Sequence, residues 1–323
     1  MNRRSFMGTV LGAVLATPLF SEAQQAGKVY RIGVIDPGSP IHARPQWKGF
    51  FQELRDGGYV IGQNLQFDFR RADRPDKLQS YVEELLRLGV DMIMTGGTPP
   101  TVAAKQATST VPVVFYNVSD PVGSGLVASL SRPGGNLTGL THISKEINNK
   151  RVELLKDAIP SLSRVALLAG ASANLTLADT ETAARKLGLT PIIVSALDPG
   201  AFEEAFAKMR NESVGAVIIL PDVFFYVHRQ RIADLAINYH LPTVSELVGY
   251  VTVGGFMSYG ASPTDIGNHL GAYVVRILKG ARPGDLPVQQ PTTFELVINV
   301  RTARILGLRI PQSLLQRADQ VIE

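Results

Sequence analysis

Strand-like and helix-like patterns alternate along most of this chain. Residues 30–35 form an apolar, β-branched run typical of a buried strand, and residues 45–56 then carry apolar side chains at helical spacing. The same rhythm continues to residue 116 and returns between residues 165 and 244. Strands that alternate with helices indicate βαβ units with parallel sheets and right-handed crossovers. The sequence therefore predicts an α/β fold.

A break separates the two series of βαβ units. It begins with Pro-Gly-Gly at residues 133–135 and extends to Lys145, and it indicates two lobes. The tail after Gly254 predicts one long helix over residues 265–279 and two short extended pieces, too little for a third domain. We therefore expect the tail to cross back and complete both lobes. The expected boundaries are residues 1–23 for an export signal, 28–145 with 259–290 for lobe 1, and 146–258 with 291–323 for lobe 2.

The N-terminus has the features of a bacterial export signal. The pair Arg3-Arg4 precedes an uncharged run over residues 8–20, which closes on a small-residue cleavage site ending at Ala23. The run is shorter than the roughly 20 apolar residues of a membrane span, and an anchor helix that stays attached is the alternative. The arginine pair suits the twin-arginine route, but general secretory signals also carry two basic residues, so both routes stay open. Cleavage after Ala23 predicts a mature protein in the periplasm.

The composition excludes several classes of function. The chain of 323 residues has no cysteine, which excludes disulfides, a thiol nucleophile, a Cys-bearing metal site and the cysteine that anchors a lipoprotein. Its net charge of +4 is mild and its basic residues are scattered, so nucleic acid is not an expected partner. The five histidines show no metal-ligand spacing. We expect no metal and no cofactor.

Signatures of catalysis are weak. Residues 123–128 match the loose dinucleotide pattern Gly-x-Gly-x-x-Ala, but they lie late in the lobe rather than after its first strand. The chain has no phosphate-binding P-loop, no Gly-x-Ser-x-Gly nucleophile elbow and no His-Glu-x-x-His motif. An exported α/β enzyme is therefore the least favoured of the function classes.

Loops that follow the predicted strands are the candidate ligand-binding segments, because open α/β sheets bind ligands beyond the carboxyl ends of their strands. The loops are rich in glycine, small hydroxyls and Asn or Asp, and most lead into helices whose first N–H groups suit a carboxylate. Helix capping alone would explain any single loop, whereas convergence at one sheet edge favours a cleft. The loops are residues 36–40, 95–100, 117–125, 170–174 and 221–222.

The same loops carry a resemblance to a known family. Residues 119–136 (SDPVGSGLVASLSRPGGN) resemble the longest motif of the ABC-transporter substrate-binding proteins of the tryptophan/tyrosine-binding type. Shorter matches follow in the family's order over essentially the whole mature chain. They are residues 31–35, 38–40, 97–99, 150–155, 254–260, 277–280, 294–299 and 317–323.

The resemblance implies a type I periplasmic binding fold, in which two Rossmann-like lobes with parallel sheets are joined by a multi-crossover hinge and close on a small ligand. It also implies a monomer that delivers this ligand to an ABC permease in the inner membrane, without catalysis. Family members with known ligands take aromatic amino acids; another amino acid or a small organic acid is the alternative. A ligand-sensing module that docks on a membrane receptor is the rival function of the same fold.

An amino-acid ligand carries a carboxylate and an ammonium group, and each predicts a role for particular residues of the site. We expect the hydroxyls of Ser39, Thr98 and Ser119, or nearby amides, to bind the carboxylate. We expect Asp120 or Asp222 to bind the ammonium group, because a buried charge pair of this kind contributes strongly to affinity.

Aromatic residues complete the expected site. Phe224, Phe225 or Tyr250 would line an apolar wall or stack on a ring of the ligand, although core packing explains Phe224 and Phe225 equally well. The full expected set of ligand-binding residues is Ser39, Thr98, Pro99, Ser119, Asp120, Asn174, Asp222, Phe224 and Tyr250.

Overall fold

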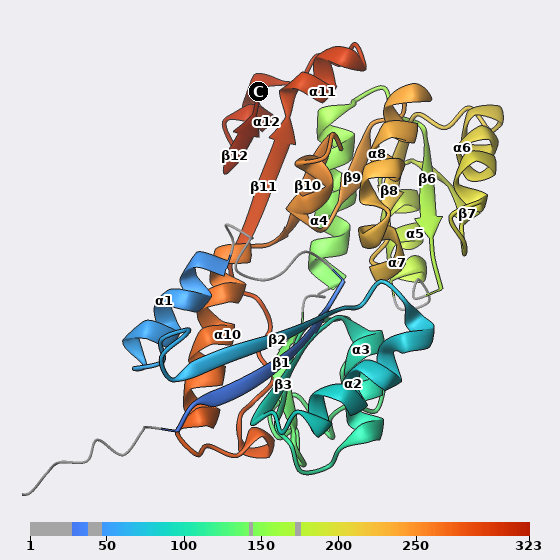
Figure 1. Cartoon of the computed structure of the whole chain (residues 1–323). Coiled ribbons are helices and arrows are strands. Elements are labelled where there is room, and N and C mark those ends of the chain that lie inside the picture. The colour runs from blue at the N-terminus through green and yellow to red at the C-terminus, as the bar shows by residue number, and fades with distance from the viewer. Residues whose placement is uncertain (1–27, 38–46, 142–144, 172–175) are drawn as a thin grey trace, which may run out of the picture.

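The structure is a computed structural model that describes residues 28–37, 47–141, 145–171 and 176–323. The described chain forms two α/β lobes, each built on its own sheet (Figure 1). The predicted export signal at residues 1–23 lies outside the described residues. In the part of the chain that the structure describes, no helix is both long enough and apolar enough to cross a membrane.

Lobe 1 contains a parallel sheet of five strands in the order β2-β1-β3-β4-β5. The strands are β1 (Tyr30–Asp36), β2 (Leu65–Arg71), β3 (Met92–Gly96), β4 (Val113–Val118) and β5 (Leu137–Thr141). The helices are α1 (Lys48–Asp56), α2 (Leu78–Arg87), α3 (Thr98–Ala107) and α10 (Pro263–Leu278), with the short 3-10 helices η3 (Pro75–Lys77) and η5 (Pro283–Asp285).

Helices cover both faces of this sheet. In β1, Ile32 and Val34 pack with residues of α1 and α10, whereas Ile35 packs with residues of α2 and α3. Burial on both faces explains why the strands are continuous apolar runs rather than alternating ones. Helix α10 lies against α1 although it comes from late in the chain (Figure 1), and a Cβ at Gly271 would lie only 2.9 Å from the carbonyl oxygen of Phe50.

Lobe 2 contains a sheet of seven strands in the order β12-β11-β10-β9-β8-β6-β7. The β10–β11 pair is antiparallel and the other pairs are parallel. The strands are β6 (Arg164–Ala169), β7 (Thr190–Ser195), β8 (Ala216–Ile219), β9 (Thr243–Ser245), β10 (Met257–Ala261), β11 (Phe294–Asn299) and β12 (Gln320–Ile322). The helices are α4 (Lys145–Ala158), α5 (Leu177–Lys186), α6 (Ala201–Asn211), α7 (Val223–Val227), α8 (Arg229–Asn238), α9 (Val248–Val251), α11 (Val300–Ile305) and α12 (Gln312–Leu315).

The core of lobe 2 also lies on both faces of its sheet. In β6, Val165 and Leu167 pack with residues of α4 and α5, and Ala166 and Leu168 pack with residues of α6 and α8. Two mostly parallel sheets with helices on both faces confirm the prediction of an α/β fold.

The chain crosses between the lobes after β5, after β10 and before β11 (Figure 1). Two of these crossings are joined, because the backbone N–H of Ser262 donates to the carbonyl of Thr293 at 2.9 Å and its hydroxyl donates to the carboxylate of Glu295. The tail thus contributes α10 to lobe 1, and β11 and β12 to lobe 2. The expected boundary at residue 259 falls inside β10, whose pairing with β9 and β11 assigns the whole strand to lobe 2.

Candidate ligand-binding site

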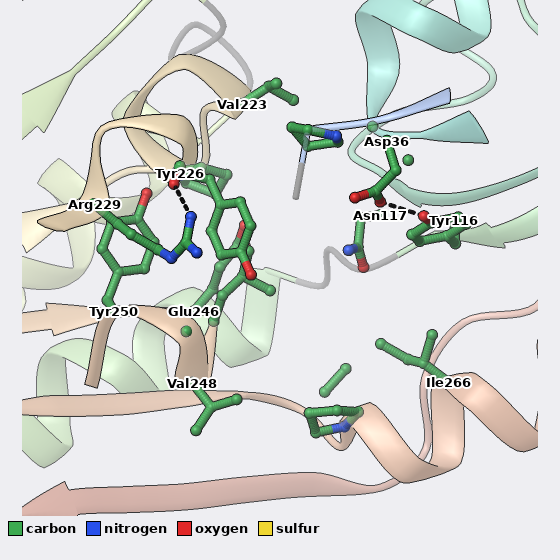
Figure 2. Close-up of a pocket in the computed structure, with 18 of the residues that line it drawn as sticks. Asp36, Tyr116, Asn117, Val223, Tyr226, Arg229, Glu246, Val248, Tyr250 and Ile266 are labelled. Carbon is green, nitrogen blue, oxygen red and sulfur yellow. Dashed lines mark hydrogen bonds between the residues drawn. The ribbon is translucent and has the colours of Figure 1, made fainter. Parts of the chain in front are cut away.

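A cavity of about 680 Å³ lies between the lobes. Lobe 1 contributes the carboxyl ends of β1, β3 and β4, and lobe 2 contributes the segments that follow β8 and β9 (Figure 2). Ala261, Pro263 and Glu295, at the crossings between the lobes, also line the cavity, as do residues of the first turns of α10, Ile266 among them. Parallel α/β sheets bind ligands at this edge, and the volume suits a small molecule.

Lobe 1 presents a buried carboxylate to the cavity. Asp36 is the last residue of β1 and is 2% exposed, and the hydroxyl of Tyr116 on β4 donates a hydrogen bond to it (Figure 2). Trp47 packs edge-on against Tyr116, with ring centroids 5.2 Å apart. Strand β3 lies between β1 and β4, and a Cβ at Gly96 would collide with the Asp36 carboxylate. A glycine at position 96 therefore makes the Asp36–Tyr116 pair possible.

An irregular strand end brings a second polar group to the same wall. Asn117 has a φ of 54°, a left-handed conformation that asparagine tolerates better than most residues, and the pairing of β4 with β5 shifts register there. The side-chain oxygen of Asn117 is buried and has no hydrogen-bond donor among the described residues. Because Asn117 lines the cavity, a donor group on a ligand would satisfy this oxygen.

Helix α3 begins at the cavity, and the lobes approach each other there. Gly97 has a φ of 97°, and Thr98 and Pro99 form the first turn of the helix. The N–H of Ser119 points to Oγ1 of Thr98 at 3.5 Å. A Cβ at Gly97 would lie 2.8 Å from Cγ2 of Val223 on lobe 2. The lobes thus touch where a helix N-terminus faces the cavity.

Lobe 2 supplies an aromatic wall with one arginine on it. The rings of Tyr226 and Tyr250 meet at 74° with centroids 5.9 Å apart. The guanidinium of Arg229 lies 4.5 Å from the centroid of the Tyr226 ring, and its Nη1 donates to the Tyr226 carbonyl at 2.8 Å (Figure 2). A Cβ at Gly249 would lie 2.8 Å from Cε2 and from the hydroxyl oxygen of Tyr226, so the glycine leaves room for the Tyr226 side chain.

Two carboxylates line the same wall. Asp222 begins α7 and accepts a hydrogen bond from the N–H of Phe224 at 2.8 Å. Glu246 follows β9, and its Oε2 lies 3.9 Å from Nη2 of the buried Arg151. Burial raises the pKa of the Tyr250 phenol well above its ordinary value, and the charge of Glu246 adds to this shift. Tyr250 is therefore a neutral hydroxyl at physiological pH.

Arg151 does not line the cavity itself but lies next to Glu246, which does. Its Nε donates to the Tyr259 carbonyl at 3.0 Å and its Nη1 donates to Oδ1 of Asn148 at 3.1 Å. Burial lowers the pKa of Arg151 from its ordinary value, and the nearby Glu246 carboxylate opposes this shift. An arginine remains charged under such a shift, so it joins α4 and β10 to the carboxylate that lines the cavity.

The structure brings five of the nine expected residues to the cavity: Thr98, Pro99, Ser119, Asp222 and Tyr250. Ser39 and Asn174 lie outside the described residues. Asp120 and Phe224 are not in the lining. The carboxylate of Asp120 accepts the N–H of Gly123 at 2.7 Å inside a tight turn, and the ring of Phe224 stacks on Phe202 with centroids 5.4 Å apart.

Sequence reasoning missed several lining residues. Asp36 lies in one of the candidate loops and Glu246 lies in a distinctive stretch, residues 245–250, that flanks the expected cleft, but neither residue has a role assigned from sequence. Tyr116 and Arg229 lie in a predicted strand and a predicted helix, where an aromatic or a basic residue carries no functional signal. These residues can be identified as lining residues only from the folded structure, in which both lobes border the cavity.

Comparison with known proteins agrees with this geometry. A family model described as ABC transporter substrate binding protein matches residues 39–322. A tyrosine-binding protein from Clostridioides difficile (strain R20291) is 26% identical over 268 residues, which is 81% of this chain and 76% of that protein.

Solved structures agree as well. A conserved domain protein from Vibrio cholerae O1 biovar El Tor is 29% identical, with a TM-score of 0.81 over 91% of this chain and 100% of that chain. The ABC domain from Streptococcus pneumoniae in complex with L-Trp is 27% identical, with the same TM-score and coverage.

These matches confirm the resemblance and the two-lobed periplasmic binding fold. Proteins of this family bind a substrate and are not enzymes, which confirms the expectation of a binding protein. The family model spans far more than half of the residues. The chain therefore belongs to the family of ABC transporter substrate-binding proteins.

Proposed function

We propose that this protein is the periplasmic receptor of an ABC importer, and that it captures an aromatic amino acid between its lobes and delivers it to a permease in the inner membrane. The observation that carries the proposal is the lining of the cavity. It combines tyrosine rings with carboxylates and an arginine, and an aromatic amino acid carries a ring, an ammonium group and a carboxylate. Two similar proteins, named for tyrosine and solved with L-Trp, support the same class of ligand.

The two-lobed lining supports a mechanism by closure. A ligand that touches Asp36 or Tyr116 on lobe 1 and Tyr226 or Arg229 on lobe 2 has more contacts in the closed state than in the open one. Such a ligand shifts the population toward the closed state by its difference in affinity for the two states. A permease that recognises the closed shape would then distinguish loaded from empty receptor.

Calorimetric titration of refolded mature protein tests the capture step, because refolding removes a ligand that survives purification. The panel is L-tryptophan, L-tyrosine, L-phenylalanine, L-leucine, benzoate and glucose. We expect heat of binding with one or more aromatic amino acids. In unfolding measurements on the same protein, we expect the free energy of unfolding to rise by roughly 2.7 kcal/mol when the ligand concentration is a hundredfold above Kd. Binding of benzoate or glucose alone would contradict the proposed ligand class.

Uptake measurements test the delivery step. Deletion of the gene in its source bacterium should abolish high-affinity import of the labelled amino acid identified by titration, and a copy with an intact cavity should restore it. Unchanged import in the deletion strain would leave a binding protein that does not serve this transport.

A further inference from the structure

Arg229 differs from the other charged residues of the cavity. Among the described lining residues it is the only Lys or Arg, whereas Asp36, Asp222, Glu246 and Glu295 are all acidic. No carboxylate of the described chain lies within ion-pair distance of its guanidinium. Within that part of the chain, its side chain has one hydrogen bond, from Nη1 to the Tyr226 carbonyl at 2.8 Å, and one ring contact, with Tyr226.

This arrangement fixes the guanidinium without neutralising it. A carbonyl oxygen holds one N–H group and the Tyr226 ring holds one face, so the remaining donors keep a fixed direction at the cavity wall (Figure 2). Arg229 is half-buried, and a ligand that covers its guanidinium without bringing an anion would remove the charge from water at a cost in free energy. The planar fork of arginine matches a carboxylate with two parallel hydrogen bonds, and a preorganised fork loses little entropy on binding.

The neighbouring carboxylates do not fill this role. Glu246 lies 3.9 Å from the buried Arg151, and Asp222 accepts the Phe224 N–H at the start of α7. The anion that completes Arg229 must therefore come from outside the described chain. A ligand in the cavity can bring it directly against the guanidinium.

We infer that Arg229 binds the carboxylate of the captured ligand and thereby selects amino acids over the corresponding amines. The inference rests on the proposed function and deepens it, because it assigns the carboxylate to lobe 2. The expectation from sequence placed the carboxylate on lobe 1, at Ser39, Thr98 and Ser119 or nearby amides; Ser39 lies outside the described residues. There, Oγ1 of Thr98 already faces the N–H of Ser119.

The test compares ligands that differ only at the carboxylate. Titrations use L-tryptophan, L-tryptophanamide and tryptamine with wild type, Arg229→Gln and Arg229→Lys. The matched control is Arg231→Gln, which removes the same charge from the same helix. Arg231 also lies beside an aromatic ring, 5.9 Å from the Phe202 centroid, but it pairs with Glu203 and does not line the cavity.

The expected result is a loss confined to the carboxylate. Arg229→Gln should weaken L-tryptophan binding by about 10- to 100-fold, the range for a hydrogen bond to a charged group. It should leave tryptamine binding within about twofold. Arg229→Lys should recover part of the loss, because it keeps the charge without the fork, and Arg231→Gln should bind like wild type.

Two results would overturn the inference, and they are distinguishable from failure of the proposed function. If Arg229→Gln weakens all three ligands equally, or none, then Arg229 does not bind the carboxylate although the protein still binds amino acids. If wild type binds tryptamine as tightly as L-tryptophan, nothing in the site selects a carboxylate. If wild type binds no aromatic amino acid at all, the proposed function is wrong, and the inference, which rests on it, is wrong as well. Unchanged melting temperatures of Arg229→Gln and Arg229→Lys exclude a folding defect.

Discussion

The hydroxyl of Tyr116 donates a hydrogen bond to the carboxylate of Asp36, although strand β3 separates the two strands that carry them. Both side chains are 2% exposed. The bond passes over Gly96, where a Cβ would lie 2.9 Å from the Tyr116 hydroxyl oxygen. The bond therefore links the carboxyl ends of β1 and β4 across β3, and all three strand ends line the cavity.

Removal of this hydroxyl should lower both stability and affinity. Tyr116→Phe deprives a buried carboxylate of a donor, which costs about 1–3 kcal/mol in free energy of unfolding. Urea unfolding and titration with L-tryptophan measure the two effects. Tyr239→Phe is the control, because the described structure gives the Tyr239 hydroxyl no hydrogen bond and its ring packs against Phe206 away from the cavity. Equal effects of the two changes would contradict a special role of the Asp36–Tyr116 bond.

Enlargement of Gly97 should push the lobes apart. A methyl group there would lie 2.8 Å from Cγ2 of Val223 across the cavity, so Gly97→Ala should weaken L-tryptophan binding by about tenfold, or about 1.4 kcal/mol. Small-angle scattering should show a larger radius of gyration with ligand present. Gly280→Ala is the control for backbone strain, since Gly280 has a φ of 99° with no atom near its Cβ position. Addition of Val223→Ala to Gly97→Ala should restore affinity, and a failure to do so would refute the steric explanation.

Separation of Arg151 from Glu246 should destabilise the protein more than removal of both charges. Arg151→Met leaves a carboxylate that is only 11% exposed without its cationic neighbour. Loss of one partner of a buried pair costs about 3–5 kcal/mol in free energy of unfolding. The double variant Arg151→Met with Glu246→Gln should recover part of this loss. Chemical denaturation of the wild type, both single variants and the double variant measures the coupling, and purely additive losses would exclude it.

The pair of Arg31 and Asp68 predicts a pH dependence of stability. The hydrogen bond from Arg31 lowers the pKa of Asp68 below its ordinary value of 3.8. Its contribution is therefore complete above pH 3.8 and is lost as the pH falls through the lower pKa of the folded state. Asp68→Asn should lower the urea midpoint at pH 7, and its difference from wild type should shrink below pH 3.8. Asp76→Asn removes an exposed partner of Arg74 and should change the midpoint little at either pH; a constant Asp68→Asn difference would refute the linkage.

Much of the fold could be predicted from the sequence, because alternating βαβ patterns need only local information. Strand β5 was missed for a physical reason. It follows the two glycines at residues 134 and 135, both with positive φ, so its five residues resemble the end of a loop. Gly139 within it packs against the backbone of Phe115, where any side chain would collide. A strand whose central residue is glycine carries little β signal of its own.

The site was less predictable than the fold. The loops after β3 and β4 could be placed because parallel strands share one carboxyl edge, and Thr98 and Ser119 do line the cavity. Phe224 was misplaced because an aromatic ring after a strand suits the core and a cleft equally, and here it stacks on Phe202. The role inferred for Arg229 depends on which charges lie across the interlobe space, and no spacing along the chain encodes that.

The position of α10 has a consequence for the order in which the molecule can be assembled. Its residues Leu270 and Val274 pack on the face of β1 that carries Ile32 and Val34, yet they are synthesised after most of lobe 2, from α4 to β10. A nascent chain that ends before Pro263 has every strand of lobe 1, but α1 alone covers the part of that face where α10 would also pack. The core of the N-terminal lobe is therefore incomplete until α10 has been synthesised, unlike that of a domain whose residues are all contiguous in the chain. Both lobes thus lack part of their native cores until the last fifth of the polypeptide has been made.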